Sequence, residues 1–323
     1  LGLIIVDEEH DTSFKQHQPA PRYHARDTAI YLAQLHNAKV LLGSATPSVE
    51  SYYNAKKGKY ALVEMHTRFA DIALPKIETI DIRKAYLKKE MKHQFAPTML
   101  NAIQETLEAG KQVILFQNRR GYSHIISCGA CGYTPNCNSC DVSLTFHKWN
   151  NQLKCHYCGY IEQVPELCPI CTAKDFSDKG FGTEQIEESL KELLPYYVTK
   201  RMDYDTTRGK NAHQQIITDF EQGRIDLLVG TQMITKGLDF DNVALVGILN
   251  ADSMLHFPDF RAYERAFQLM MQVAGRAGRK VEQGKVLIQT YDEEHFMFAL
   301  LKKNPTRSNL LLLSQRKVKA LSK

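Results

Sequence analysis

Short apolar runs alternate with amphipathic stretches along most of the chain. The runs are four to seven residues long and contain few polar side chains, which is typical of strands buried on both faces of a parallel sheet. The amphipathic stretches carry apolar residues at helical spacing, as in Leu100, Ile103 and Leu107, and end at Gly or Pro. The predicted strands are residues 2–6, 39–42, 113–116, 226–229, 243–249 and 286–290.

This alternation predicts an α/β fold with parallel sheets flanked by helices. A Lys-rich stretch from residue 51 to residue 90 has no clean period, so we place a domain boundary near residues 71–75. We therefore expect two α/β domains with a small insert. The expected domains are residues 1–70, residues 71–126 joined to 174–300, an insert at 127–173 and a basic tail at 301–323.

Polar clusters directly follow three of the predicted strands. Asp7 and Glu8 follow the first, Ser44 to Thr46 follow the second, and Thr231 and Gln232 follow a third. Ligands of open parallel sheets bind at the carboxyl ends of the strands. The sequence therefore predicts that these clusters share a cleft.

The residue types in this predicted cleft suit a nucleoside triphosphate. Asp7 can hold Mg²⁺ through its water shell, and Glu8 can orient or deprotonate an attacking water. A solvated acidic turn explains Asp7–His10 equally well. Arg276 and Arg279 lie three residues apart, which would place them on one helix face. A guanidinium that reaches the γ-phosphate raises the rate about 10³–10⁵-fold, while the alternative is a basic helix paired with surface acids.

The cysteines form four Cys-x-x-Cys pairs between residues 128 and 171, and no secretory signal opens the chain. That pattern indicates metal binding in a reducing cytosol rather than a disulfide framework. The two middle pairs are separated by 14 residues, close to zinc-ribbon spacing, whereas the first two are separated by only five. Spacing therefore predicts two nested groups: Cys137, Cys140, Cys155 and Cys158 inside, with Cys128, Cys131, Cys168 and Cys171 around them.

Two structural Zn²⁺ ions fit these groups, because four thiolates leave no open coordination position. An iron–sulfur cluster is the weaker alternative. Four aromatic residues lie in the same insert: Tyr133, Phe146, Trp149 and Tyr157. At least two are expected in its small core, and the others could stack on a base or a partner.

Aromatic and cationic residues alternate between residues 9 and 26. Phe14, Lys15, Arg22 and Tyr23 would suit single-stranded bases, since each stacked base contributes about 1–3 kcal/mol and cations neutralise phosphates. The alternative is an ordinary loop with a buried Phe and Tyr. The segment comes directly after Glu8, and this position favours a role in binding single-stranded DNA, because a DNA contact there could act on that carboxylate.

Several motifs together resemble a known family. Residues 7–10, 43–47, 230–239 and 272–279 are similar to motifs II, III, V and VI of superfamily 2 helicases, in the same order. Residues 10–16, 22–27 and 118–122, with the eight-cysteine insert after them, narrow the resemblance to the PriA family. It covers nearly all of residues 1–300, and it implies two recA-like lobes with a two-zinc Cys₄ insert and the same nested cysteine pairing.

The resemblance also implies roles for single residues. Asp7 would serve Mg²⁺, Glu8 the water, and Arg276 and Arg279 the γ-phosphate of ATP. Residues that sense the nucleotide or couple it to DNA would be His10, Ser44, Thr46, Gly237, Asp239 and Gln272. Residues that contact DNA would be Phe14, Lys15, Arg22, Tyr23, Arg119, Thr231, Gln232 and Lys236.

The implied function is ATP-dependent 3′→5′ DNA unwinding in replication restart, with loading of the replicative helicase at stalled forks. Implied partners are forked and single-stranded DNA, primosome proteins and single-stranded DNA-binding protein, in the cytoplasm at the nucleoid. A zinc-containing platform that binds DNA or primosome proteins without hydrolysis is the main alternative, and a restriction or repair motor is a third. The net charge of +5 permits a nucleic-acid partner without demanding one.

Two features set limits on this interpretation. None of the four Gly-Lys steps, which end at residues 59, 111, 210 and 285, is followed by Ser or Thr. A phosphate-binding loop needs that residue, so we expect the loop on an upstream part and no appreciable ATP hydrolysis by this chain alone. The resemblance ends near Leu301. No run of about 18 apolar residues predicts a membrane span.

Overall fold

The computed structural model divides the chain after residue 66 into two compact units. It describes residues 1–65, 73–118, 125–140, 142–147, 149–174, 176–177, 182–209, 211–235, 240–278 and 283–302. Both units are α/β with parallel strands, and the second carries the cysteine-rich insert. The predicted fold class is therefore confirmed. Within the described ranges, no helix has the length and apolar character that crossing a bilayer requires.

The first unit is built on two parallel strands. β1 (Leu3–Val6) pairs with β2 (Lys39–Leu42), and α1 (Ala25–Leu35) is the crossover between them. A short 3₁₀ turn, η1 (Thr12–Phe14), precedes α1, and α2 (Val49–Lys56) follows β2. The side chain of Ser48 caps α2 by accepting the Ser51 N–H. This order places the residues after β1 and those after β2 at the same edge of the sheet.

The prediction that β1 is buried on both faces is wrong for the described residues. Leu3 and Ile5 are 52% and 63% exposed, whereas Val6 is buried. The sheet has two strands here, and α1 packs on it. The apolar residues of the other face therefore meet solvent.

We expect this small sheet to open more readily than the sheet of the second unit. Two strands with one covered face are marginally stable in water, whereas a multi-stranded buried sheet is not. Amides of β1 and β2 should exchange with deuterium at least about 100-fold faster than those of the buried strand 112–116, which corresponds to about 3 kcal/mol in opening free energy. Hydrogen exchange read by mass spectrometry measures this. Equal protection in the two units would contradict it.

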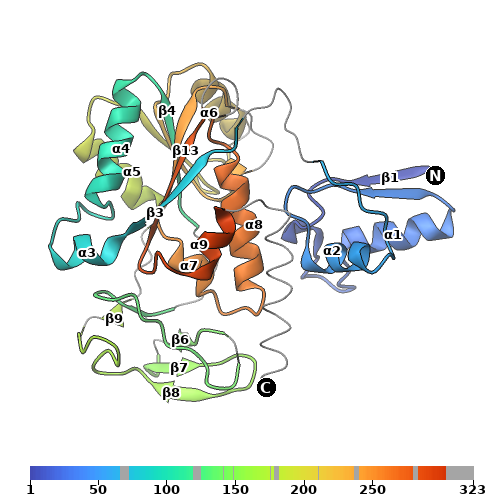
Figure 1. Ribbon diagram of the computed structural model, residues 1–323, viewed down its shortest axis with the longest axis horizontal. Helices are drawn as coiled ribbons and strands as arrows, with labels where there is room; N and C mark the ends of the chain where they lie inside the picture. Colours follow the sequence, from blue (N-terminus) through green and yellow to red (C-terminus); the bar gives the residue numbers. More distant parts are fainter. Residues whose placement is uncertain are drawn as a thin grey trace. The chain divides into compact units, whose positions relative to one another are not determined.

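The second unit is built on a six-stranded parallel sheet of order β10-β11-β4-β12-β13-β3. β4 lies inside the sheet, and all five of its residues are buried. Figure 1 shows the insert, which carries β6, β7 and β8, beside this sheet. The strands are β3 (Lys76–Asp81), β4 (Gln112–Phe116), β10 (Thr199–Met202), β11 (Leu227–Gly230), β12 (Val243–Ile248) and β13 (Lys285–Thr290).

Two helices of this unit, α4 and α6, end at the glycines that the sequence predicts. Gly110 and Gly223 both adopt positive φ, of 68° and 71°, just beyond α4 and α6. α4 supplies Met99 and Ile103 to the main core, where they pack with strand residues such as Leu115. The helices are α3 (Ile82–Leu87), α4 (Pro97–Glu108), α5 (Thr183–Leu193), α6 (Ala212–Glu221), α7 (Asp252–Leu255), α8 (Ala262–Ala274) and α9 (Phe296–Leu301), with a 3₁₀ turn η3 (Gln232–Thr235).

The cysteine-rich insert leaves the rest of the second unit, here called the lobe, after β4. It returns to the lobe before α5. Its two ends pair as antiparallel strands, β5 (Ser127–Cys128) and β9 (Phe176–Ser177). Between them lies a three-stranded antiparallel sheet of β6 (Thr145–His147), β7 (Gln152–Lys154) and β8 (Ile161–Gln163). A separate small core holds it, with Val142, Leu144 and Leu153 at its centre. Because its ends meet, the insert can emerge from the lobe without separating the strands that flank it.

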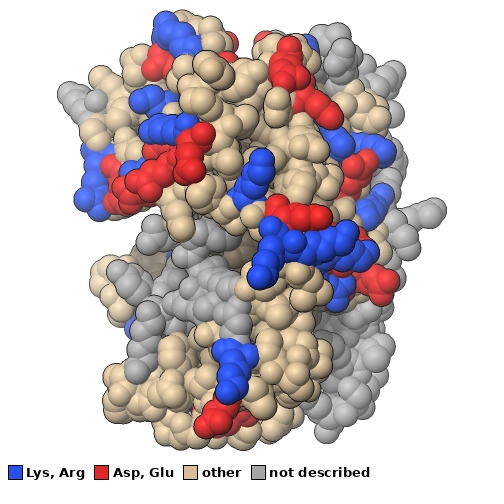
Figure 2. Space-filling view, turned by 90° about the vertical axis from the view of Figure 1, so that its left-hand side faces the viewer, with Lys and Arg blue, Asp and Glu red and all other residues tan. Residues whose placement is uncertain are grey.

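One face of the surface carries mixed charge. In Figure 2, Lys and Arg side chains lie beside Asp and Glu side chains, and no large patch of one sign appears among the described residues of this face. Such a face creates little net field for a polyanion. A phosphate backbone therefore has no electrostatic reason to prefer it.

Candidate functional site

The cysteine pairs share one local geometry. The N–H of the first cysteine in each pair donates to the carbonyl five residues later: Cys128 to Tyr133, Cys137 to Val142, Cys155 to Tyr160 and Cys168 to Ala173. In three of the pairs a residue with positive φ follows the second cysteine, and these are Gly132, Gly159 and Thr172. The tight turn directs both thiols of a pair to the same side. The chain thus contains four copies of a metal-binding turn.

The four turns combine into two groups of four thiols. The Sγ atoms of each group lie within 4.8 Å of one another. The distance from Cys128 to Cys171 is 3.5 Å, and that from Cys137 to Cys158 is also 3.5 Å. Tetrahedral Zn²⁺ with Zn–S bonds of about 2.3 Å needs thiolates about 3.8 Å apart, so the geometry fits. The members are Cys128, Cys131, Cys168 and Cys171, and Cys137, Cys140, Cys155 and Cys158, the nested sets that spacing predicts.

The thiols within a group differ in acidity. Burial raises the pKa of Cys155, but the backbone N–H groups of Cys158 and Tyr157 outweigh it and lower the pKa to about 7. Cys168 in the other group also has a pKa of about 7, for the same kind of reason. Burial and neighbouring thiols raise the pKa of Cys131 and Cys140 to about 12. A metal ion must therefore displace protons, and its affinity should fall as the pH falls.

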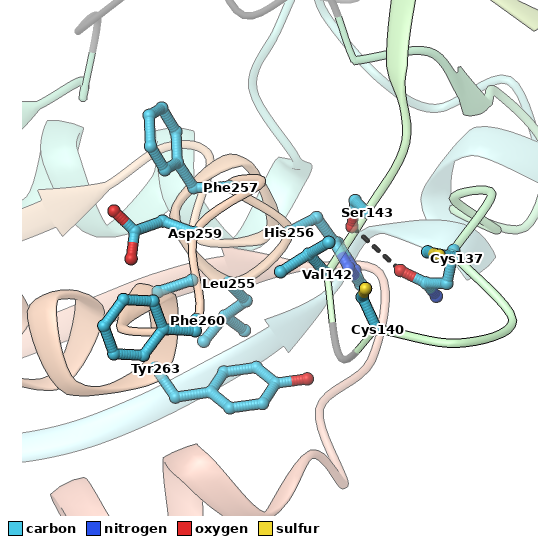
Figure 3. Close-up of a pocket in the computed structure, with 12 residues that line it drawn as sticks. Cys137, Cys140, Val142, Ser143, Leu255, His256, Phe257, Asp259, Phe260 and Tyr263 are labelled. Carbon is cyan, nitrogen blue, oxygen red and sulfur yellow. Dashed lines mark hydrogen bonds between the residues drawn. The ribbon is translucent and has the colours of Figure 1, made fainter. Parts of the chain in front are cut away.

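The inner group lies against the lobe. A pocket of about 150 Å³ separates Cys137 and Cys140 from the turn between α7 and α8. Figure 3 shows Phe260 and Tyr263 on one side of this pocket and Cys137, Cys140 and Ser143 on the other. Ser143 donates to the Asn136 side chain at 2.9 Å. The inner group therefore faces the turn between α7 and α8 across this pocket.

A second contact fixes the outer group on the same lobe. A Cβ on Gly132 would lie 2.4 Å from Cβ of Tyr291, which follows β13, so only glycine fits there. Beyond it, the exposed rings of Tyr157 and Phe260 meet edge to face at 6.5 Å. These contacts hold the insert on the lobe at more than one point.

The aromatic residues of the insert divide as expected into core and surface. Phe146 packs on the core of the insert, and Tyr133 meets Phe176 edge to face at 6.4 Å. Trp149 is 85% exposed and Tyr157 is 53% exposed. The latter two remain candidates for contacts outside the chain.

The predicted acidic turn follows β1. Glu8 adopts a left-handed conformation, with φ of 48°, and its N–H donates to the Asp7 carboxylate at 2.9 Å. Such a conformation costs a non-glycine residue about 1–3 kcal/mol and is found preferentially at functional sites. The left-handed turn directs Glu8 and the next residue, Glu9, to different neighbours.

The turn after β1 is bonded to the turn after β2. His10 Nδ1 lies 2.7 Å from Ser44 Oγ and 3.5 Å from the Glu8 carboxylate. Ser44 Oγ in turn accepts the Thr46 N–H at 3.0 Å. His10 therefore lies at ion-pair distance from the predicted water-activating carboxylate and is hydrogen-bonded to Ser44, one of the predicted coupling residues.

The aromatic segment forms a short hairpin. Asp11 accepts the Ser13 N–H at 2.8 Å, which starts η1, and the Gln16 N–H donates to the Tyr23 carbonyl at 3.0 Å. Arg22 and Tyr23 are exposed, whereas Phe14 and Lys15 are half-buried. The side chains proposed for DNA therefore come from a defined loop, with Arg22 and Tyr23 open to solvent.

Sequence reasoning missed two side chains in this unit. Glu9 is buried and forms an ion pair with Arg26, with 2.8 Å between Oε2 and Nη1. No residue spacing indicates such a pair, because 16 residues separate its members. Hydrogen bonds to Asp27 and Glu9 outweigh desolvation and raise the pKa of Arg26, so it stays charged.

The predicted motifs of the second unit meet at the end of β11. Gln232 begins η3 and donates to Asn118 at 3.5 Å, a long hydrogen bond. A Cβ on Gly230 would lie 2.4 Å from Ile234, so the turn that leads to Thr231 requires glycine. The structure thus places the start of the 230–239 motif beside the end of β4.

The prediction that Arg276 and Arg279 share a helix face is wrong. α8 carries Gln272 but ends at Ala274, and Gly278 has φ of 63°, which breaks the helical path. Arg276 is buried beyond the helix end and donates to the Thr235 carbonyl in η3. Arg276 therefore brings the predicted motif at residues 272–279 into direct contact with the one at residues 230–239.

Five predicted site residues lie outside the described residues. They are Arg119, Lys236, Gly237, Asp239 and Arg279. Asp7 and Glu8 belong to the first unit and Arg276 to the second. Their convergence on one nucleotide remains a prediction.

Two sequence models of known families match the chain. The PriA DNA helicase Cys-rich region (CRR) domain matches residues 137–162, and the helicase conserved C-terminal domain matches residues 175–281. The first spans the inner cysteine group. The second spans the segment from β9 to Arg276.

Curated relatives match the chain over most of its length. The replication restart protein PriA of Bacillus subtilis is 47% identical over 302 residues, which cover 94% of this chain and 37% of that protein. The protein of the same name from Treponema pallidum is 47% identical over 295 residues, with 91% and 44% covered. The chain thus spans less than half the length of these relatives.

Solved structures show a weaker likeness. Saccharomyces cerevisiae Dbp5 bound to RNA and ADP BeF3 matches with a TM-score of 0.48 and 13% identity, over 94% of this chain and 57% of that chain. RecG bound to a three-way DNA junction matches with a TM-score of 0.43 and 13% identity, over 96% and 29%. Likeness at this level carries no argument about function.

Proposed function

We propose, on the premise that this chain belongs to the PriA family, that it is part of an ATP-dependent 3′→5′ DNA helicase that restarts replication at stalled forks. The observation that carries the proposal is the 47% identity over 94% of the chain to a protein named for replication restart. The position of His10, 3.5 Å from the Glu8 carboxylate and hydrogen-bonded to Ser44, supports it, because a motor must link nucleotide chemistry to movement.

The nucleotide roles follow the predicted motifs. Asp7 would hold Mg²⁺ through water, and Glu8 would orient the attacking water of ATP hydrolysis. Arg276 and Arg279 would neutralise charge on the γ-phosphate. His10, Ser44 and Thr46 have the contacts that such coupling needs. Gln272, Gly237 and Asp239 complete the proposed nucleotide set.

The DNA roles fall on two regions. In the hairpin of residues 11–24, Tyr23 and Phe14 would stack on unpaired bases, while Lys15 and Arg22 would neutralise phosphates. Near the end of β11, Thr231, Gln232, Lys236 and, from the preceding segment, Arg119 would contact the DNA backbone. The proposed strand is single-stranded DNA at a fork.

The insert would act as a structural zinc module. Both cysteine groups are closed Cys₄ sets, so the bound ions would hold the fold and would not take part in hydrolysis. The exposed Trp149 and Tyr157 would be available to DNA or to a primosome protein. We place the protein in the cytoplasm at the nucleoid, with single-stranded DNA-binding protein as a further partner, from the family relationship.

A strand-separation assay tests the proposal directly. The natural gene product that contains this sequence is mixed with ATP and forked duplexes that carry one labelled strand and a single-stranded arm of either polarity. We expect unwinding that requires ATP. We also expect it only on forks whose single-stranded arm has the polarity that 3′→5′ movement requires. Binding to forks without ATP-dependent unwinding would replace the proposal with the non-hydrolysing platform.

We further expect these 323 residues alone to hydrolyse ATP no faster than a buffer control. Phosphate release with and without single-stranded DNA measures this. None of the Gly-Lys steps in the sequence has the following Ser or Thr that a phosphate loop uses to hold Mg²⁺. A DNA-stimulated rate from these residues would contradict the expectation and would require another phosphate-binding element within them.

A Phe14→Ala substitution should weaken the link between DNA and hydrolysis. The loss of one stacked base contact of about 1–3 kcal/mol predicts that half-maximal stimulation needs about 5- to 150-fold more DNA. ATPase rates of the natural gene product, titrated with oligo(dT), measure this. Tyr31→Ala is the matched control, since that ring is exposed on α1 outside the hairpin. An unchanged titration would remove Phe14 from the DNA site.

A further inference from the structure

Glu9 is a buried carboxylate with a complete set of partners. Its side chain is 1% exposed. It accepts the Ser48 N–H at 2.6 Å, the Ser48 hydroxyl at 3.0 Å and the Ser51 hydroxyl at 2.8 Å. A buried charge with one partner removed is strongly destabilising, so these contacts form or break as a set. Glu9 therefore fixes the acidic turn to the start of α2.

Arg26 completes the same cluster from a third segment. Its Nη1 donates to the Glu9 carboxylate and to Ser48 Oγ, both at 2.8 Å. Its Nε donates outward to Asp27, also at 2.8 Å. The side chain of Asp27 is 59% exposed, whereas that of Arg26 is 11% exposed. One guanidinium thus joins an inner, buried acid and an outer, solvated one.

These contacts hold both ends of the aromatic hairpin on the acidic turn. The entering end is held by the Asp11 N–H, which donates to the Glu8 carbonyl at 2.8 Å. The leaving end is held by Arg26 at the start of α1, bound to Glu9. Both ends of the hairpin are therefore attached to two consecutive glutamates. Movement of the hairpin must act on the backbone between Glu8 and Glu9, where Glu8 has its left-handed φ.

We infer that the Glu9–Arg26 pair is a positioning device that transmits contact at the aromatic hairpin to the orientation of Glu8. The inference rests on the proposed function, because it assumes that Glu8 serves hydrolysis and that the hairpin meets DNA. Glu9 and Arg26 bond to each other and to neighbouring side chains, so their proposed role is to position Glu8. They make the acidic turn, the hairpin and the start of α2 move as one body.

Asp27 offers a control, because it bonds to the same guanidinium as Glu9 does. Arg26→Gln and Arg26→Lys alter the buried bond to Glu9, whereas Asp27→Asn removes only the exposed partner of the same guanidinium. In the natural gene product, the first two should lower the stimulation of ATPase by single-stranded DNA at least about 10-fold and leave the DNA-free rate within about twofold. Asp27→Asn should leave both rates unchanged. Arg26→Lys keeps the charge and should retain part of the stimulation.

A second readout does not need hydrolysis. In the 323-residue chain itself, Arg26→Lys should speed deuterium exchange of the backbone amides in residues 8–16 while those of α1 and β2 keep their protection. Glu9→Gln combined with Arg26→Gln should show less than the sum of the two single effects, because the pair acts as a unit.

Three outcomes would overturn the inference. The DNA-free and stimulated rates could fall by one common factor together with faster exchange throughout residues 1–65, which indicates a general fold defect. Asp27→Asn could cause the same loss as Arg26→Gln. The Arg26 variants could also leave stimulation intact. By contrast, an unaltered gene product without DNA-stimulated hydrolysis would overturn the proposed function itself, and the exchange experiment would then still report whether the pair holds the hairpin.

Discussion

Replacing Cys155 with serine should release one of two zinc ions and unfold the inner part of the insert, while the six-stranded sheet stays folded. Cys155 is buried and its thiol has a pKa of about 7, which favours the thiolate that binds metal. Serine cannot supply that ligand at neutral pH. A structural zinc site in a small domain contributes about 10–16 kcal/mol of apparent binding free energy, as much as the whole stability of many domains. The small core of the insert cannot replace that contribution.

Metal content and tryptophan fluorescence measure this result. Elemental analysis should fall from two zinc ions per chain to one. The emission of Trp149, the only tryptophan, should change little in wavelength because the ring is already exposed, so its anisotropy is the better probe of a loosened insert. Ile170→Ala is the matched control, since Ile170 is exposed between the ligands Cys168 and Cys171 but offers no ligand atom. Two ions retained in the Cys155 variant would remove that residue from the site.

A Glu8→Gln substitution should lower ATP hydrolysis by the natural gene product about 10²–10⁴-fold, with little change in the KM for ATP. Glutamine has nearly the shape of glutamate and meets the same left-handed backbone, so the fold should persist. It cannot accept a proton from the attacking water. The His10–Ser44 bond does not require the Glu8 carboxylate, so the link between the two turns should remain.

Steady-state hydrolysis with saturating single-stranded DNA measures the effect. Glu108→Gln makes the same chemical change at the exposed end of α4 and should leave the rate unaltered. A Glu8 variant that retains more than about a tenth of the rate would show that another group activates the water, and the assignment of motif II would need revision.

The sequence predicted the metal centres better than any other part of the site. Each metal-binding turn is local, since its hydrogen bonds join residues four or five apart, so spacing alone carries the information. The nested pairing could be inferred because the short link between the first two pairs disfavours a shared ion. The residues that the structure groups around each centre are the ones that spacing grouped.

The strands show what pattern analysis misses. β3 mixes charged, polar and apolar residues as Lys-Ile-Glu-Thr-Ile-Asp, because it is the last strand of its sheet and has pairing partners on one side only. β10, with sequence Thr-Lys-Arg-Met, is the opposite edge strand and also lacks a continuous apolar run. Neither was predicted. Buried strands such as β4 gave a clear apolar run.

The charged residues of the first unit could not be ranked from sequence. Three consecutive acids read as one solvated turn, yet Glu9 is buried and Glu8 remains partly exposed. The difference arises from the left-handed backbone at Glu8, which cannot be predicted from the residue type. Arg276 shows the same limit, because the end of α8 at Ala274 determines its neighbours and the Gly-Arg steps alone suggested a continuing helix.

The nested arrangement of the two cysteine groups has a consequence for biosynthesis. The inner group is complete once Cys158 has left the ribosome, whereas the outer group must wait for Cys168 and Cys171. The loop that joins the two halves of the outer group is then already shortened by the folded inner part, which lowers the entropic cost of closing it. A nascent chain that stalls between these points would hold one ion and leave Cys128 and Cys131 open to oxidation. We therefore expect the yield of correctly assembled protein to depend on the metal supply during translation.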